Sequence, residues 1–310
     1  MKTKVVAVVG PTASGKTALS IELAKKLNGE IISCDSMQIY KYMDIGTAKP
    51  TVQEMDGVVH HMIDIVEPDV EFSCADYACI AKEKINEISA KGMLPIFCGG
   101  TGLYVDHVIS NTEFSDAGRD DGYRAFLEQK IADEGVDVVF DLLKKIDPIS
   151  ASSIHPNNKK RVIRALEIYH TTGRTKSEWD KESKNTESPY DVKMICLDFR
   201  DREVLYDRIN KRVDIMLEMG LVDEVRSLLE QGIELSSTAR QGIGYKEIIE
   251  YINGNMTLDE SIELIKKGTR NYAKRQLTWF RRYESCHHIY VDECENFNEI
   301  VNIAKNILCD

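Results

Sequence analysis

The sequence of 310 residues lacks any apolar run close to the ~20 residues that a bilayer crossing requires. Its apolar stretch near the N-terminus, VVAVV, ends at Gly10 and Pro11, so a secretory signal is not expected. The eight cysteines include no CxxC pair, and several lie in apolar runs. We therefore expect reduced, buried thiols in a cytoplasmic protein without a membrane partner, rather than disulfides or a zinc module.

The sequence also lacks an excess of positive charge: its net charge is −11 at pH 7. A protein of this charge does not coat nucleic acid with its whole surface, so any such site must be local. Two segments could provide one. Residues 158–176 hold six basic residues against the single acid Glu167, and residues 266–282 hold seven basic residues and no acid.

Strand-like and helix-like patterns alternate in the first third of the chain. A β-branched run is followed by leucines at helical spacing, and further buried strands and a helix come after it. The expected elements are strands at 4–9, 30–34 and 93–100, with helices after residue 15 and over 75–91. Strands separated by helices predict a parallel sheet with right-handed crossovers.

From about residue 115 the pattern becomes purely helical. We expect helices over 123–133, 136–145 and 158–172, before strands return at 192–199 and 287–292. The predicted fold is α/β: a P-loop NTPase-like core with a parallel sheet flanked by helices, plus an inserted all-helical domain. The predicted domains are residues 1–115 and 191–310 for the core and its C-terminal helices, and 116–190 for the insert.

The first strand leads into GPTASGKT, the G-x4-G-K-T spacing of a phosphate-binding P-loop. Backbone N–H groups, the start of a helix and a lysine together attract phosphate oxygens. The predicted phosphate-binding residues are Gly10, Pro11, Thr12, Ala13, Ser14, Gly15, Lys16 and Thr17. The hydroxyl of Thr17 is the predicted ligand of Mg²⁺.

A P-loop does not report what is attached to the phosphates, so kinase, GTPase and diphosphate-releasing transferase all stay open. The absence of an NKxD-type guanine reader argues against the GTPase. Asp198 at the end of a strand is either a metal-holding acid or a helix cap.

Two further polar side chains follow predicted strands. Asp35 comes directly after the second strand, and Thr101 comes after the glycines that end the third. Both should lie at the carboxyl edge of the sheet beside the P-loop. There Asp35 could be a base, a metal ligand or a helix cap.

Together, eight ordered motifs resemble the tRNA dimethylallyltransferases over nearly the whole chain, in the shorter bacterial form. They are GPTASGKT, DSMQIY at 35–40, IGTAKP at 45–50, HHMIDI at 60–65, GGTGLYVD at 99–106, IHPNNKKRVIRALEIY at 154–169, RQGIGYKE at 240–247 and KRQLTWFRR at 274–282.

The resemblance implies transfer of a dimethylallyl group from dimethylallyl diphosphate to N6 of adenosine 37 in tRNA, by a monomer. Lys16 and the P-loop would then bind the leaving diphosphate, Asp35 would be the general base, and Thr101 would contact the reacting centre. Arg161 and Arg212 match diphosphate-binding positions. The implied tRNA-binding residues are Asp35, Ser36, Met37, Gln38, Thr101, Arg124, Lys160, Arg161, Arg164, Arg240, Gln241, Gly244, Tyr245, Lys274, Arg275, Gln276 and Arg281.

In the second basic segment Lys267, Arg270, Lys274 and Arg281 share one helical face and the apolar residues another, as in an amphipathic surface helix. The absence of acids from this segment of an acidic protein favours RNA binding. Three alternatives remain: an adenylate isopentenyltransferase acting on free nucleotide, a small-molecule P-loop kinase, and a non-catalytic RNA-binding protein.

Overall fold

In the computed structural model, which describes residues 2–110, 118–183 and 187–309, six parallel strands form one sheet. Their order is β3-β2-β4-β1-β5-β6. The strands are β1 Thr3–Val9, β2 Gly29–Ser33, β3 His60–His61, β4 Leu94–Gly99, β5 Tyr190–Asp198 and β6 Cys286–Tyr290. The α/β class and the parallel sheet are thus confirmed.

Chain contacts divide the protein into two units, residues 1–109 with 189–310, and residues 110–188. The predicted insert was 116–190. Its first boundary lies outside the described residues, and its second falls just inside β5, where Tyr190 pairs with Thr3.

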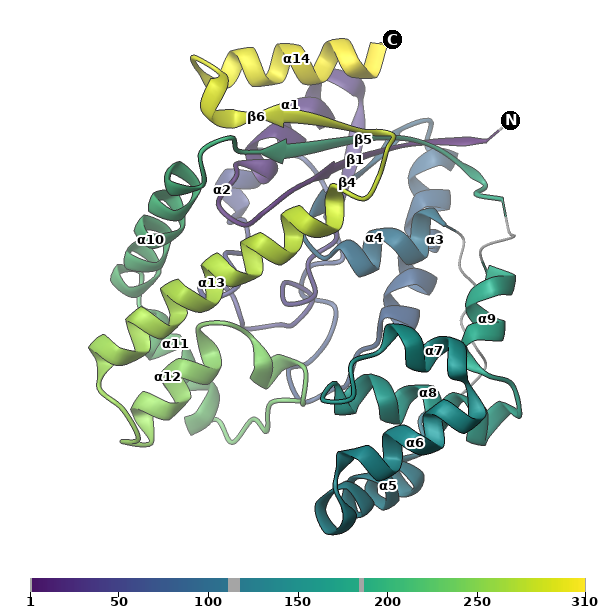
Figure 1. Ribbon diagram of the computed structural model, residues 1–310. Coiled ribbons are helices and arrows are strands. Elements are labelled where there is room, and N and C mark those ends of the chain that lie inside the picture. The colour runs from purple at the N-terminus through teal and green to yellow at the C-terminus, as the bar shows by residue number, and fades with distance from the viewer. Residues whose placement is uncertain (1, 111–117, 184–186, 310) are drawn as a thin grey trace. The chain divides into compact units, whose positions relative to one another are not determined.

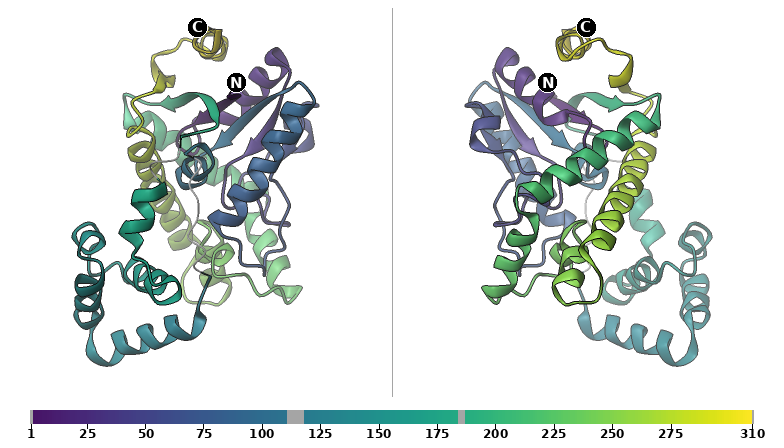
Figure 2. Two further views of the ribbon diagram at one scale, coloured as in Figure 1. Left: turned by 90° about the vertical axis from the view of Figure 1, so that its right-hand side faces the viewer. Right: turned by 90° about the vertical axis from the view of Figure 1, so that its left-hand side faces the viewer.

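Helices cover both faces of the sheet in the first unit (Figures 1 and 2). The helices of this unit are α1 Lys16–Leu27, α2 Val52–Met55, α3 Cys74–Ala90, α4 Gly102–Ile109, α10 Arg202–Glu218, α11 Leu221–Glu230, α12 Tyr245–Ile252, α13 Leu258–Phe280 and α14 Phe297–Cys309, with 3₁₀ turns η1 Ala239–Gln241 and η2 Val291–Glu293. On one face α1 and α14 lie side by side, and Leu19, Leu23 and Ala304 pack in one buried cluster with strand residues.

A second buried cluster supports the segment that follows β2. Ile39, Tyr40 and Met43 pack there against residues of α11, α12 and α13, including Tyr245 and Ile265. These side chains have at most 2% of their surface exposed. The segment 35–43, which contains Asp35, is therefore held by helices far away in sequence.

The second unit is a bundle of short helices: α5 Asp121–Glu134, α6 Val136–Ile146, α7 Pro148–Ser153, α8 Lys159–Thr172 and α9 Lys176–Ser183. Leu127, Val139, Leu143 and Val162 form its buried core. Asp147 caps α7 by accepting the N–H of Ser150 at 3.0 Å, with proline at the first helical position.

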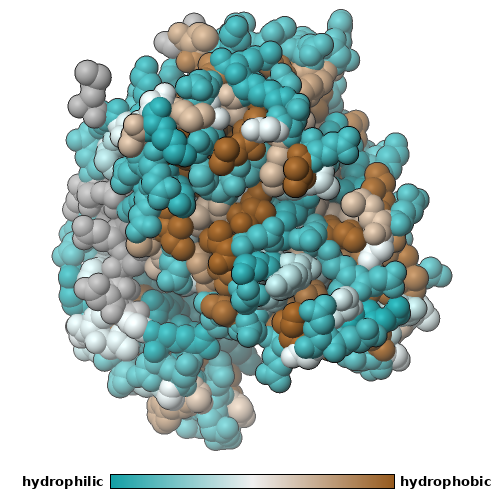
Figure 3. Space-filling view, turned by 180° about the vertical axis from the view of Figure 1, so that it is seen from behind, coloured by the Kyte–Doolittle hydropathy of each residue, from teal (hydrophilic) through white to brown (hydrophobic). Residues whose placement is uncertain are grey.

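The strands and helices expected from sequence are confirmed with ends shifted by a few residues. The two-residue β3 and the polar helix α9 were not expected, because neither is long and apolar enough to give a periodic signal. Among the described residues no helix is long and apolar enough to span a membrane. The face drawn in Figure 3 is mainly hydrophilic, with apolar residues in scattered groups.

Candidate active site

The P-loop connects β1 to α1 through backbone conformations that few residues adopt. Gly10 has φ 139°, and a side chain there would lie 2.5 Å from the carbonyl oxygen of Leu197 on β5. Gly15, with φ 96°, precedes α1 and offers no side-chain cap, and the first turn of α1 has no acid. The first N–H groups of α1 thus remain available to an anion.

Side chains from distant helices fix the shape of this loop. Gln276 of α13 accepts the N–H of Thr12 at 2.9 Å and donates to the carbonyl of Gly100 at 3.1 Å. Arg208 of α10 donates to the carbonyl of Ala13 at 2.9 Å, and Lys16 donates to Pro11 at 2.6 Å. These bonds pre-organise the backbone donors before any ligand arrives.

The hydroxyl of Ser14 is a buried polar group in the same loop. Its side-chain oxygen has no hydrogen-bond partner in the described part of the chain, and the residue is only 2% exposed. Such groups are rare in folded proteins and need an explanation. A ligand held by the loop would supply the missing partner.

Asp35 lies immediately beyond β2, at the carboxyl edge of the sheet. Its carboxylate accepts the N–H of Met37 at 2.9 Å, which orients the side chain. Burial raises the pKa of Asp35 above its ordinary value, while the backbone donors and the charges of Lys16 and Arg212 act in the opposite direction. A carboxylate with a raised pKa binds a proton more readily, as a general base must.

Lys16 and Arg212 bring positive charge to the same place from two different elements. Burial lowers the pKa of Lys16 and of Arg212, and the carboxylate of Asp35 partly restores both. Lys16 starts α1 and Arg212 lies in α10. The structure therefore brings together three of the residues predicted from sequence, with two cations near enough to one carboxylate to interact with it electrostatically.

Thr101 joins the neighbouring strand end to this group. Its backbone N–H donates to Cys34 at 3.0 Å, and its hydroxyl oxygen accepts the N–H of Ser36 at 3.0 Å. The hydroxyl also lies in hydrogen-bond contact with Tyr272 of α13, whose pKa is raised by burial and by the charge of Asp35. Tyr272 was not singled out from sequence. Its position four residues before Gln276, on the same helical face, was the available signal.

The donor set suits Mg²⁺ only if the substrate supplies most of the ligands. Among residues 2–110, 118–183 and 187–309, no group of three or more His, Cys, Asp or Glu side chains could hold a metal. Thr17 provides a hard hydroxyl oxygen in the first turn of α1. Mg²⁺ is commonly held by one or two protein oxygens, substrate phosphates and water, so these residues fit it.

The residues predicted to bind tRNA differ in exposure, and Asp35, Ser36, Met37, Gln38, Thr101, Arg124 and Arg164 are half-buried. Lys160, Arg161, Arg240, Gln241, Lys274 and Arg275 are exposed. Tyr245 and Gln276, by contrast, are buried, with at most 4% of each residue exposed. In this structure Tyr245 donates to Glu224 and Gln276 bonds the P-loop, so both support the site from within.

Arg124 and Arg164 have a partner inside the second unit. Arg124 donates to the carboxylate of Glu167 at 2.6 and 2.8 Å, and Arg164 donates to it at 2.6 Å. The Glu167 side chain is fully buried. Burial alone would raise its pKa, but the hydrogen bonds from both arginines lower it to about 2. The acid noted in the first basic segment thus neutralises Arg164 of that segment and Arg124 of α5.

Partners also reduce the free charge of the second basic segment. Lys266 pairs with Asp214 at 2.7 Å, Arg281 with Asp198 at 2.9 Å and Arg282 with Asp106 at 3.4 Å. Asp198 is buried and also contacts His288. It is therefore part of an ion-pair cluster and does not cap a helix. Arg281 follows the end of α13 and faces this cluster.

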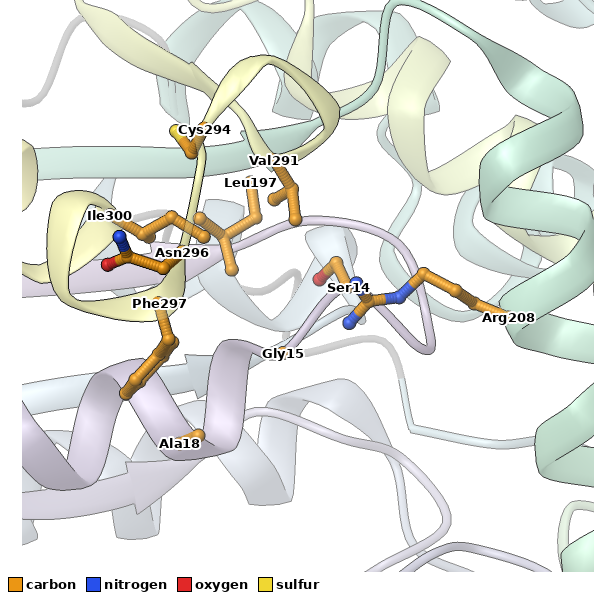
Figure 4. Close-up of a pocket in the computed structure, with 10 residues that line it drawn as sticks. All are labelled: Ser14, Gly15, Ala18, Leu197, Arg208, Val291, Cys294, Asn296, Phe297 and Ile300. Atoms are coloured by element: carbon orange, nitrogen blue, oxygen red, sulfur yellow. The ribbon is translucent and has the colours of Figure 1, made fainter.

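A pocket of about 330 Å³ lies against another part of the P-loop (Figure 4). Ser14, Gly15 and Ala18 border it together with Arg208 and the segment that contains Asn296 and Phe297. Asp35, Thr101 and Arg212 are not among its lining residues. It is thus distinct from the group around Asp35.

Comparison with known proteins identifies the family. The IPP transferase family model matches residues 38–283. A tRNA dimethylallyltransferase from Thermoanaerobacter sp. (strain X514) is 50% identical over 309 residues, covering 99% of this chain and 97% of that protein. The crystal structure of a tRNA isopentenylpyrophosphate transferase from Bacillus halodurans is similar with a TM-score of 0.74 and 48% identity, covering 99% of this chain and 96% of the other.

A eukaryotic dimethylallyltransferase, described as acting on tRNA, gives a TM-score of 0.84 at 31% identity, over 97% of this chain and 77% of that one. Close sequence relatives and two similar structures thus agree with the family model. The chain belongs to the IPP transferase family.

Proposed function

We propose that the protein transfers a dimethylallyl group from dimethylallyl diphosphate to N6 of adenosine 37 in tRNA. In this reaction the bond between the allylic carbon and the bridging oxygen breaks, and a bond from N6 to that carbon forms. The proton of N6 passes to Asp35, and diphosphate leaves. The tRNA dimethylallyltransferases at about half identity support the assignment.

The observation that carries the proposal is the group formed by Asp35, Lys16 and Arg212. A P-loop alone serves many reactions, whereas a base with raised pKa beside two cations suits a reaction that removes a proton and releases an anion. Lys16 and the N–H groups of the P-loop stabilise charge where it develops on diphosphate. The exocyclic amine is a weak nucleophile, so a base at Asp35 assists its attack.

We propose that Thr101 acts at the bridging oxygen. Its hydroxyl is fixed between Ser36 and Tyr272, beside Asp35. A fixed hydroxyl donates a hydrogen bond to a leaving oxygen without adding bulk. Mg²⁺, bound through Thr17 and the diphosphate, would supply further charge neutralisation at the leaving group.

We propose that the exposed basic residues contact the phosphates of the anticodon stem-loop. Lys274 and Arg275 lie on α13 between Tyr272, which contacts Thr101, and Gln276, which bonds the P-loop. A base in a single-stranded loop is splayed out at low cost. The predicted roles of Arg161 and Lys160 and the predicted monomeric state belong to the same proposal.

The decisive test supplies dimethylallyl diphosphate with either tRNA or AMP and analyses the products by mass spectrometry. Prenylated adenosine 37 in tRNA, with AMP unchanged, is the expected result. Prenylated AMP alone would assign the protein to the adenylate isopentenyltransferases. Phosphate transfer from ATP without prenylation would make it a kinase. The absence of any product, with Asp35→Ala binding tRNA as the parent does, would leave only RNA binding.

A further inference from the structure

Glu224, in the first turn of α11, accepts four hydrogen bonds with one carboxylate. Three come from the consecutive N–H groups of Asp44, Ile45 and Gly46, at 2.9, 2.7 and 3.1 Å. The fourth comes from the hydroxyl of Tyr245 at 2.6 Å. Each carboxylate oxygen receives two donors. No motif from the sequence analysis includes this residue.

The loop held by Glu224 supports the segment that carries Asp35. The side-chain amide of Gln38 donates to the carbonyls of Thr47 and Ala48, at 3.3 and 3.2 Å, and accepts the hydroxyl of Ser33 at 2.9 Å. The amide therefore has donors and acceptors in one fixed orientation. Gln38 lies three residues after Asp35, so the loop position sets the course of the chain there.

The contact with Tyr245 ties a third segment to the same carboxylate. The ring of Tyr245 packs on the Cα of Gly46, where a methyl group would lie 2.5 Å from it. Gly242, three residues before Tyr245, packs equally closely on Met37. Burial and the charge of Glu224 raise the pKa of Tyr245, so its hydroxyl keeps its proton and remains a donor.

We propose that Glu224 is a positioning residue for the RNA substrate. One carboxylate joins the loop 44–48 to the start of α12, and through them sets the places of Met37, Gln38 and the exposed residues Arg240 and Gln241. The inference rests on the proposed function. It adds a residue that does not touch RNA itself but supports the residues proposed to do so. The P-loop is held separately, by Gln276 and Arg208, so donor binding does not depend on Glu224.

A negative charge is required at this position. Four donors converge on Glu224, and bonds to an ionised acceptor are stronger than neutral ones. Glutamine has the same shape, but its NH₂ group would face two of these donors and could not accept from them. We call the four hydrogen bonds to Glu224 the clamp. Glu224→Gln therefore breaks the clamp with the smallest change in side-chain volume.

The experiment measures steady-state prenylation with tRNA varied at saturating donor, and with donor varied at saturating tRNA. Asp223→Asn is the matched control, because Asp223 is its exposed neighbour in the same helical turn and pairs only with Arg226 among the described residues. Glu224→Gln should raise the KM for tRNA by about tenfold or more. The KM for donor and the control's constants should stay at parent values.

Tyr245→Phe removes a single bond of the clamp and should raise the KM for tRNA by a smaller factor, in the same direction. It also tests the proposal if Glu224→Gln does not fold. An unchanged KM for tRNA in both variants, or an equal loss of donor and tRNA affinity, overturns the inference. Failure of the proposed function is a different result, because the parent protein itself would then not prenylate tRNA.

Discussion

The side-chain amide of Gln276 accepts a hydrogen bond from the backbone N–H of Thr12, across 264 residues of sequence, at 2.9 Å. Gln276 is also bonded to Gly100, the residue before Thr101. One buried glutamine thus links the phosphate-binding loop to the strand end that carries the predicted contact with the reacting centre.

Replacing Gln276 by leucine should weaken donor binding. The N–H of Thr12 would lose its acceptor and the P-loop its shape, so the KM for dimethylallyl diphosphate should rise by about tenfold. Gln53→Leu is the matched control, because that glutamine is exposed, lies outside the proposed site and has no such bond in the described structure. If Gln276→Leu changed only the affinity for tRNA, Gln276 would instead contact the RNA directly, as expected from sequence.

Asp35→Asn should reduce the rate of prenyl transfer by ~10²–10⁴-fold, since the amide cannot take the proton from N6. Single-turnover kinetics at saturating substrates isolate this step from binding. Donor affinity should change far less. A variant that keeps the parent rate would exclude Asp35 as the base.

The pH dependence of the same reaction reports the state of Asp35. Burial raises its pKa, and only the ionised form accepts a proton, so the rate is high above that pKa and falls as the pH decreases through it. The acid limb of kcat/KM should therefore lie above the ordinary aspartate value of about 3.9. A limb at or below that value contradicts a base whose pKa is raised by its surroundings.

Arg124 and Arg161 should have different roles: Arg124 stabilises the second unit, and Arg161 binds a substrate. Arg124→Ala leaves the buried carboxylate of Glu167 with fewer donors and should lower the stability of the second unit by roughly 2–3 kcal/mol. Arg161 is exposed, so Arg161→Ala should change tRNA or donor binding and leave the unfolding temperature unchanged. Calorimetry and binding assays on both variants check the contrast. Equal unfolding temperatures for Arg124→Ala and the parent would refute it.

Lys274 and Lys266 lie on the same helix but differ in their partners. Lys266 pairs with Asp214, whereas Lys274 has no ion pair in the described structure and lies 5.5 Å from the ring of Tyr206. Lys274→Gln should weaken tRNA binding and reduce the slope of log affinity against log salt by about 1. Lys266→Gln should leave the slope at its parent value. A reduced slope for Lys266→Gln with an unchanged slope for Lys274→Gln would show that the RNA does not contact Lys274.

The parts of the site that sequence predicted are those encoded locally. The P-loop spacing, the alternation of strands and helices, and the placement of Asp35 and Thr101 after strands all depend on neighbouring residues. Arg212 came from the resemblance. The structure brings it to Asp35, and periodicity alone does not show this.

The remaining features depend on pairings between distant segments. The bonds of Gln276, the four donors of Glu224 and the burial of Glu167 between two arginines leave no periodic pattern. Each of the residues Gln276, Tyr245, Arg124 and Arg281 lies in a motif of the family or matches one of its positions, and a motif does not tell a contact residue from one that supports it. Tertiary structure supplies that distinction.

The central claim is that the P-loop holds diphosphate as it leaves a five-carbon donor. It is tested most directly with dimethylallyl diphosphate that carries one label in the isoprenoid and another in the diphosphate. The account predicts that the isoprenoid label enters adenosine 37 of tRNA while the phosphorus label is released as free diphosphate, both abolished by Lys16→Ala. Phosphorus label in any acceptor, or full transfer by Lys16→Ala, would contradict it.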